Sequence, residues 1–93
     1  MNTPATAGRL VSIQPNPFTE KFTVYCSSTN PGLTEFTLTD VAGRVLRKET
    51  AVTGSGMNTI VFENLAELPK GVYFLSMATG EEKFSTMKVV KGN

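Results

Sequence analysis

Residues 22–26 read Phe-Thr-Val-Tyr-Cys, and this stretch decides the class of fold. Apolar and polar residues alternate along it, with Cys26 in phase with Phe22 and Val24. Because successive side chains of a strand point to opposite faces, this alternation predicts a β-strand with one buried face. Cys26 then lies in the core as an unreactive thiol, since the chain contains no histidine that could activate it.

The same period of two recurs along the chain in short runs that are rich in β-branched and aromatic residues. We predict seven strands, over residues 10–13, 21–27, 34–39, 44–50, 57–62, 72–78 and 84–90. Seven short strands at intervals of about 8–12 residues are typical of an immunoglobulin-like domain. The predicted fold class is therefore all-β, a seven-stranded immunoglobulin-like antiparallel β-sandwich.

The breaks between the predicted strands carry specific turn chemistry. Residues 15–17 (Pro-Asn-Pro) end the first strand, because each proline lacks a backbone donor and holds the preceding residue extended. Residues 40–43 (Asp-Val-Ala-Gly) predict a hairpin loop with a left-handed glycine, and residues 68–71 (Leu-Pro-Lys-Gly) predict a type I turn. Residues 78–81 close the last hairpin. Residues 64–68 predict a crossover with one helical turn that Asn64 can cap.

The predicted core collects the inward residues of these strands and of the crossover. In the sixth strand two phases compete, since either residues 72 and 74 or residues 73, 75 and 77 could face inward. The core list takes the second phase: Phe22, Val24, Cys26, Phe36, Leu38, Val45, Ile60, Phe62, Leu65, Leu68, Tyr73, Leu75 and Met77.

The composition fits one soluble domain. Of the 93 residues, 40% are hydrophobic and 18% are charged, enough for one modest core. We assign residues 1–9 to a flexible linker or leader and residues 10–93 to the domain. Nine basic and eight acidic residues are interspersed, which argues against nucleic acid or an anionic membrane as partner. With neither a signal peptide nor a membrane span, we expect the domain to be exported as the tail of a larger precursor.

The sequence lacks the residues that enzymes and metal sites use. Without histidine there is no His-assisted nucleophile and no His-containing zinc site. Glu81 and Glu82 are adjacent in a turn and point to opposite sides of the backbone, so they do not form a catalytic pair. The sequence contains no Asp-x-Asp spacing of the kind that calcium-binding loops use. Residues 54–56 (Gly-Ser-Gly) lack the lysine that a phosphate-binding loop needs. We expect a protein that is not an enzyme and binds no cofactor or metal.

Four motifs follow one another along the chain. They are Pro-Asn-Pro-Phe at residues 15–18, Leu-Thr-Asp-Val-Ala-Gly-Arg-Val at 38–45, Leu-Pro-Lys-Gly-Val-Tyr-Phe-Leu at 68–75 and Lys-Val-Val-Lys at 88–91. Together they cover essentially residues 12 to 91. In this order they resemble the type A C-terminal sorting domain of the type IX secretion system (Por secretion system) of Bacteroidetes-type bacteria. The resemblance implies a secretion signal that directs a cargo protein across the outer membrane and is then removed by a sortase.

The resemblance also implies partners and locations. The partners are the type IX translocon, an outer-membrane β-barrel shuttle protein, a cysteine sortase and an N-terminal cargo domain in the precursor. The domain is then expected in the periplasm in transit, and afterwards at the outer membrane or cell surface, or secreted.

Once isolated, the domain is expected to form a homodimer, because a sandwich leaves edge strands with unpaired amides.

Candidate recognition residues lie at the end of the chain and after the glycine of the first hairpin. Lys88, Val89, Val90 and Lys91 belong to a last strand with little turn chemistry after it, so a partner could capture its free end as an added strand. The lysines either steer a partner or guard an edge against aggregation. Arg44 is included because a hairpin does not need arginine after its glycine. Turn and core demands explain the other motif residues, Pro15, Asn16, Pro17, Asp40, Gly43, Gly71 and Tyr73, the last as a tyrosine corner.

Two other classes of protein share this strand pattern. An immunoglobulin-like or fibronectin-like spacer of an extracellular protein has the same strands, although a spacer has no reason to end the protein. A carbohydrate-binding or adhesin module usually exposes aromatic rings for sugar stacking, whereas this chain has no Trp and two Tyr. The strand pattern alone leaves both classes open.

Overall fold

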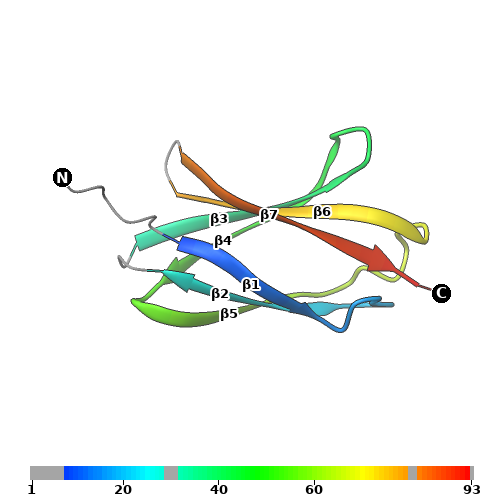
Figure 1. The fold of residues 1–93 in the computed structure, drawn as a ribbon. Helices are drawn as coiled ribbons and strands as arrows, with labels where there is room; N and C mark the ends of the chain where they lie inside the picture. The colour runs from blue at the N-terminus through cyan, green and yellow to red at the C-terminus, as the bar shows by residue number, and fades with distance from the viewer. Residues whose placement is uncertain (1–7, 29–31, 80–81, 93) are drawn as a thin grey trace.

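The computed structural model describes residues 8–28, 32–79 and 82–92, which form two antiparallel sheets packed face to face (Figure 1). One sheet has the strand order β1-β2-β5 and the other β4-β3-β6-β7. The fold is therefore a two-layered all-β sandwich, as predicted. The strands are β1 (Gly8–Gln14), β2 (Phe22–Ser28), β3 (Gly32–Asp40), β4 (Val45–Thr53), β5 (Gly56–Phe62), β6 (Gly71–Thr79) and β7 (Glu82–Lys91).

All seven predicted strands are present, and most are longer than predicted because ladder pairing continues into the flanking turns. Gly8 and Arg9, which the sequence pattern assigns to the leader, open β1 and pair with Ser28 and Ser27. The rest of the leader and Glu81 lie outside the described residues. In the described part of the chain, no helix has the length and apolar character needed to cross a membrane.

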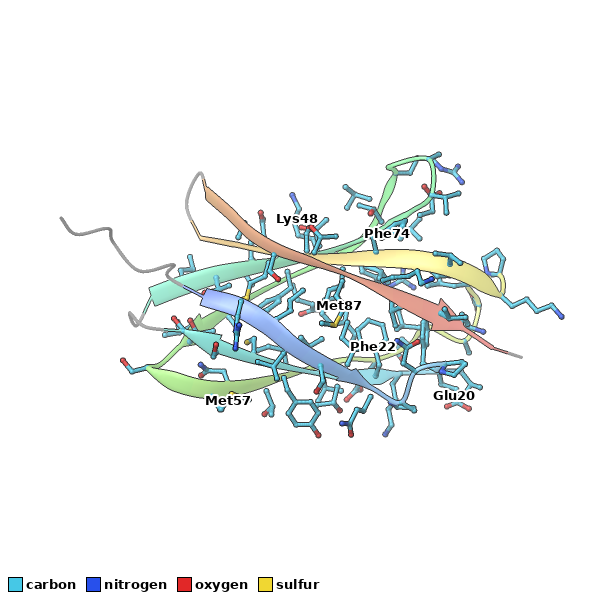
Figure 2. The ribbon with its side chains drawn as sticks, viewed as in Figure 1. Glu20, Phe22, Lys48, Met57, Phe74 and Met87 are labelled. Carbon is cyan, nitrogen blue, oxygen red and sulfur yellow. The ribbon has the colours of Figure 1, made fainter. Side chains whose placement is uncertain are left out.

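The core lies between the two sheets and follows the predicted alternation. β2 buries Phe22, Val24 and Cys26, and β6 buries its odd-numbered residues 73–77, which settles the phase of that strand. Figure 2 shows Phe22 and Met87 between the sheets. Of the predicted core, Ile60 and Leu68 are only partly buried, packed against its margin. The buried apolar residues are Leu10, Ile13, Phe18, Phe22, Val24, Cys26, Phe36, Leu38, Phe62, Leu65, Tyr73, Leu75, Met77 and Val89.

Two irregularities change which side chains reach the core. In β1 the register shifts between Leu10 and Ser12, so both Leu10 and Ile13 face inward although they are three residues apart. Between β3 and β4 the pairing shifts at Leu38, which pairs with Arg47. Val45 consequently turns outward and is 56% exposed, so its prediction as a core residue is wrong.

The chain passes between the sheets after β2, β4 and β5, and the last two of these connections lie within the described residues. After β4, the Asn58 side chain receives a hydrogen bond from the Gly54 amide at 3.0 Å and donates to the Gly54 carbonyl at 2.8 Å, which holds the corner. After β5, the predicted helical turn is reduced to one hydrogen bond, from the Leu68 amide to the Leu65 carbonyl. Asn64 has a φ of 61°, a left-handed conformation, so it does not cap a helix.

Candidate recognition site

All four sequence motifs lie at one end of the sandwich, which we call the motif end. Asp40, the last residue of β3, pairs with Tyr73 of β6. Gly71 at the start of β6 pairs with Lys91 at the end of β7, and Lys91 also forms a bridge with Phe18. Antiparallel pairing thus gathers these segments at the right of Figure 1. The motif end comprises residues 15–18, 40–45, 68–75 and 88–92.

The Asp40 side chain organises the β3–β4 hairpin. Its Oδ1 accepts hydrogen bonds from the amides of Ala42 and Arg44, at 2.9 and 3.0 Å, and its Oδ2 accepts one from Arg44 Nε at 2.8 Å. Gly43 has a φ of 89° and is the predicted left-handed residue. The hydrogen bond from the Arg44 amide lowers the pKa of the Asp40 carboxyl, and the bonds from the Arg44 side chain and the Ala42 amide add to this effect.

Arg44 carries its charge to the surface. Its side chain is 79% exposed and uses Nε for the ion pair with Asp40. Its two terminal nitrogens donate to none of the described residues. The hairpin therefore orients the guanidinium and leaves its outer end available to a partner, as recognition by Arg44 would require.

Tyr73 forms the predicted tyrosine corner. Its ring is buried, with its centroid 6.4 Å from that of Phe18, and its hydroxyl donates to the backbone carbonyl of Pro69. Gly71, between the two, has a φ of 145°, in the region that favours glycine. The conformation of the turn accounts for Gly71, and packing in the core accounts for Tyr73.

The loop after β1 covers the outer edge of β7. Asn16 Oδ1 accepts a hydrogen bond from the Val90 amide at 2.9 Å, and Asn16 Nδ2 donates to the Lys88 carbonyl at 3.5 Å. The Phe18 amide donates to the Val90 carbonyl at 2.8 Å, and the Phe18 carbonyl accepts from the Gly92 amide at 2.7 Å. One side chain and one backbone residue thus replace the neighbouring strand that this edge lacks. We call residues 15–18 the edge loop.

Phe18 anchors the edge loop in the core. Its side chain has no exposed surface, and its ring meets that of Phe22 edge-on, with 4.9 Å between the centroids. The strand pattern did not place Phe18 in the core, because no alternation surrounds it. A single aromatic residue between a proline and a polar stretch is the signal that could have found it. The prolines flanking Asn16 end β1 as predicted, and the peptide bonds before both are cis.

The end of β7 is not free, contrary to the sequence-based expectation. β6 bonds to it along one side and the edge loop along the other. Val89 is fully buried and Lys91 is 7% exposed, so these two side chains offer almost no surface to a partner. The reason is the period of the strand, because Lys91 lies two residues after Val89 and shares its inward face. Lys88 is exposed and Val90 is half-buried on the opposite face.

Outward side chains line up across the four-stranded sheet at the motif end. Thr39 of β3 pairs with Val45 and with Phe74, and Phe74 pairs with Lys88. The next pair of β6 and β7 on the same face of the sheet is Val72 with Val90. Figure 2 shows Phe74 on the outer side of this sheet. We define the outer row as Val45, Val72, Phe74, Lys88 and Val90.

Among the described residues, no three His, Cys, Asp or Glu residues gather closely enough to hold a metal ion, and no pocket opens in the surface they form. Burial raises the pKa of the Cys26 thiol, which favours its protonated, unreactive form.

One family matches the chain when it is compared with models of protein families. The family is described as the secretion system C-terminal sorting domain, and the match spans residues 12–91. A search of the curated proteins and a search of the solved structures find no match. The matched span runs from within β1 to the last residue of β7 and includes all four motifs.

Proposed function

The chain belongs to the family of secretion system C-terminal sorting domains and is a type IX secretion sorting signal, and we propose that the secretion machinery recognises its motif end. A signal of this kind directs its cargo to the cell surface or into the medium. The observation that carries the proposal is the convergence of all four motifs, which lie far apart in sequence, at one end of the sandwich.

The finer steps follow from the family resemblance. We propose that the domain crosses the periplasm attached to its cargo, engages the translocon and a β-barrel shuttle protein in the outer membrane, and is removed there by a cysteine sortase. We place the cut within or just upstream of the stretch from Met1 to about Gly8. The domain itself is proposed to have no enzymatic activity and to use no cofactor, because its role requires only a folded recognition surface.

An immunoglobulin-like topology is our proposal for the sandwich. Hairpins join β3 to β4 and β6 to β7, and crossovers carry the chain between the sheets after β2, β4 and β5. The buried Tyr73, whose hydroxyl bonds back to the carbonyl of Pro69, adds the corner that such domains share.

Homodimerisation of the isolated domain also remains our proposal. The edge loop occupies the end of β7, which leaves β1, β4 and β5 as the edges where a second copy can pair. Sedimentation that shows only monomer at high protein concentration would contradict it.

A cargo fusion tests the sorting function. A fluorescent protein with a signal peptide is joined upstream of residues 1–93 and expressed in a type IX-secreting bacterium, beside the same protein without the domain. We expect fluorescence at the cell surface or in the medium only when the domain is present. Retention of both fusions in the periplasm would contradict the function.

Deletion of residues 89–93 from this fusion is expected to block export and leave precursor in the periplasm. The deletion removes the core residue Val89 and the partners of the edge loop, so it is also expected to unfold the domain. Circular dichroism of the truncated domain measures this loss. Normal export of the truncated fusion would show that the signal lies elsewhere, with Arg44 and its hairpin the next place to look.

A further inference from the structure

We propose that the outer row is the docking surface for the type IX partner, which binds it face-on with a protein surface that carries carboxylates around an apolar centre. The proposal rests on the sorting function and specifies how the motif end is read. It differs from the capture of β7 as an added strand, because it assigns recognition to outward side chains.

The hydrogen bonds at the end of β7 argue against strand addition. The Lys88 carbonyl, both backbone groups of Val90 and the Gly92 amide lie on the edge where another strand would pair. Asn16 and Phe18 already occupy these groups, at distances from 2.7 to 3.5 Å. A partner strand would have to displace the edge loop, and with it the buried ring of Phe18.

The outer row offers apolar surface that the core does not use. Val45 is 56% exposed and Val72 is 37% exposed, and Phe74 and Val90 are half-buried beside them. The residues that alternate with them, Tyr73, Leu75 and Val89, already fill the core from the other face of the sheet. The same stretches of the motifs therefore supply both a core and an outward apolar surface.

The charge around the outer row specifies the chemistry of the partner. Lys88 stands within the row, is exposed and forms no ion pair with the described residues. Arg44 precedes Val45 and presents its two terminal nitrogens outward from the ion pair with Asp40. Two cations beside apolar side chains complement carboxylates that flank an apolar patch, and such pairs fix the register of an interface.

Site-specific photocrosslinking in the secreting bacterium tests the docking surface. A photoreactive amino acid replaces Val72 in the cargo fusion, and a matched variant carries it at Val61, which is 46% exposed in β5 of the other sheet. We expect adducts with another protein from position 72 and none from position 61. Equal adducts with another protein from both positions, or adducts from position 72 that join only two copies of the fusion, would overturn the proposal.

Charge reversal tests the complementarity. Lys88→Glu is expected to lower the adduct yield from position 72 roughly tenfold, the change that about 1.4 kcal/mol of lost binding produces. Lys21→Glu reverses another exposed lysine at the entry to β2 and is expected to leave the yield unchanged. An equal effect of the two reversals would overturn the proposal, provided that circular dichroism shows both variants folded.

Opening the β7 edge separates the two modes of binding. Asn16→Ala frees the Val90 amide and the Lys88 carbonyl while leaving the outer row in place. Face-on docking predicts no gain in adduct yield, whereas strand addition predicts a gain, which would overturn the proposal.

If the unmodified fusion is not exported, the sorting function itself fails. If it is exported but gives no adduct from position 72, only the docking surface fails.

Discussion

β4 and β7 are the two edges of the same four-stranded sheet, and they are closed in different ways. At β4 the protection is charge: Lys48 is exposed and lies 3.6 Å from the Glu35 carboxylate of the neighbouring strand. At β7 it is the edge loop, which supplies hydrogen bonds and a buried ring. Charged side chains discourage pairing with another chain without adding tertiary structure, whereas a covering loop makes the edge part of the core.

Because of this difference, we expect the two edges to contribute unequally to the free energy of unfolding. The charges of β4 are solvated and can change with little effect on folding. The end of β7 depends on residues more than seventy positions earlier in the chain, so it is intact only when the whole domain is folded. The edge nearest the proposed recognition surface is thus the edge most tightly coupled to the fold.

Phe18→Ala should have the largest effect. Truncation of this fully buried ring removes its contacts with Phe22 and Tyr73 and should lower the unfolding free energy by about 3–5 kcal/mol. Denaturant unfolding measures the loss, with Phe74→Ala on the outer face as the matched control. A smaller loss for Phe18→Ala than for Phe74→Ala would show that the edge loop is not anchored in the core.

Asn16→Ala should come second. It removes two hydrogen bonds to the backbone of β7 and should cost about 1–2 kcal/mol, since each such bond contributes about 1 kcal/mol. Amide hydrogen exchange at Val90 should accelerate, while the amides of β4 keep their wild-type rates. Unchanged protection of Val90 would mean that the Asn16 side chain does not close the edge.

Low pH should weaken the hairpin that leads into β4. The pKa of Asp40 is lowered in the folded state, so its stabilising effect is present above the unfolded pKa of about 4 and is lost as the pH falls through the lower folded value. The difference in unfolding free energy between wild type and Asp40→Asn should therefore shrink on acidification. Its persistence at about pH 2 would exclude ionisation of Asp40 as the cause.

Lys48→Ala should have the smallest effect. The ion pair with Glu35 is roughly half-exposed on both sides, and exposed pairs contribute about 0.2–1 kcal/mol. Thermal unfolding at low and high salt checks this, because screening should remove what the pair contributes. A loss comparable to that of Asn16→Ala would break the distinction between the two edges.

The strands and their turns could be predicted from sequence because their signals are local. Alternation over a few residues identifies β2 and its buried face, and it predicts β6 as a strand while leaving two phases open there. The Asp-Val-Ala-Gly and Leu-Pro-Lys-Gly segments mark where the hairpin loop lies and where β6 begins. The prediction that Val45 lies in the core was wrong for an equally local reason. Val45 and Leu46 are both apolar, so alternation does not choose between them, and the register shift at Leu38 turns Leu46 towards the core.

The candidate site was harder to predict because its parts meet only in the folded domain. The sequence supplied Asn16, Arg44 and the last strand as motif residues, but nothing local shows that the carboxamide of Asn16 reaches Val90. The burial of Lys91 could have been found by extending the period of two from Val89. The outer row needs the register of four strands, which single-strand patterns do not give.

The span between Asn16 and Val90 also sets an order in time. A ribosome delivers the chain from its N-terminus, so β1 and the edge loop emerge well before residues 88–92 exist. Until then the loop has no strand to cover, and the sheet that contains β3 and β6 ends one strand early. Closure of the β7 edge is therefore complete only after synthesis has passed Gly92, and a chain that stops before this residue leaves the edge partly open.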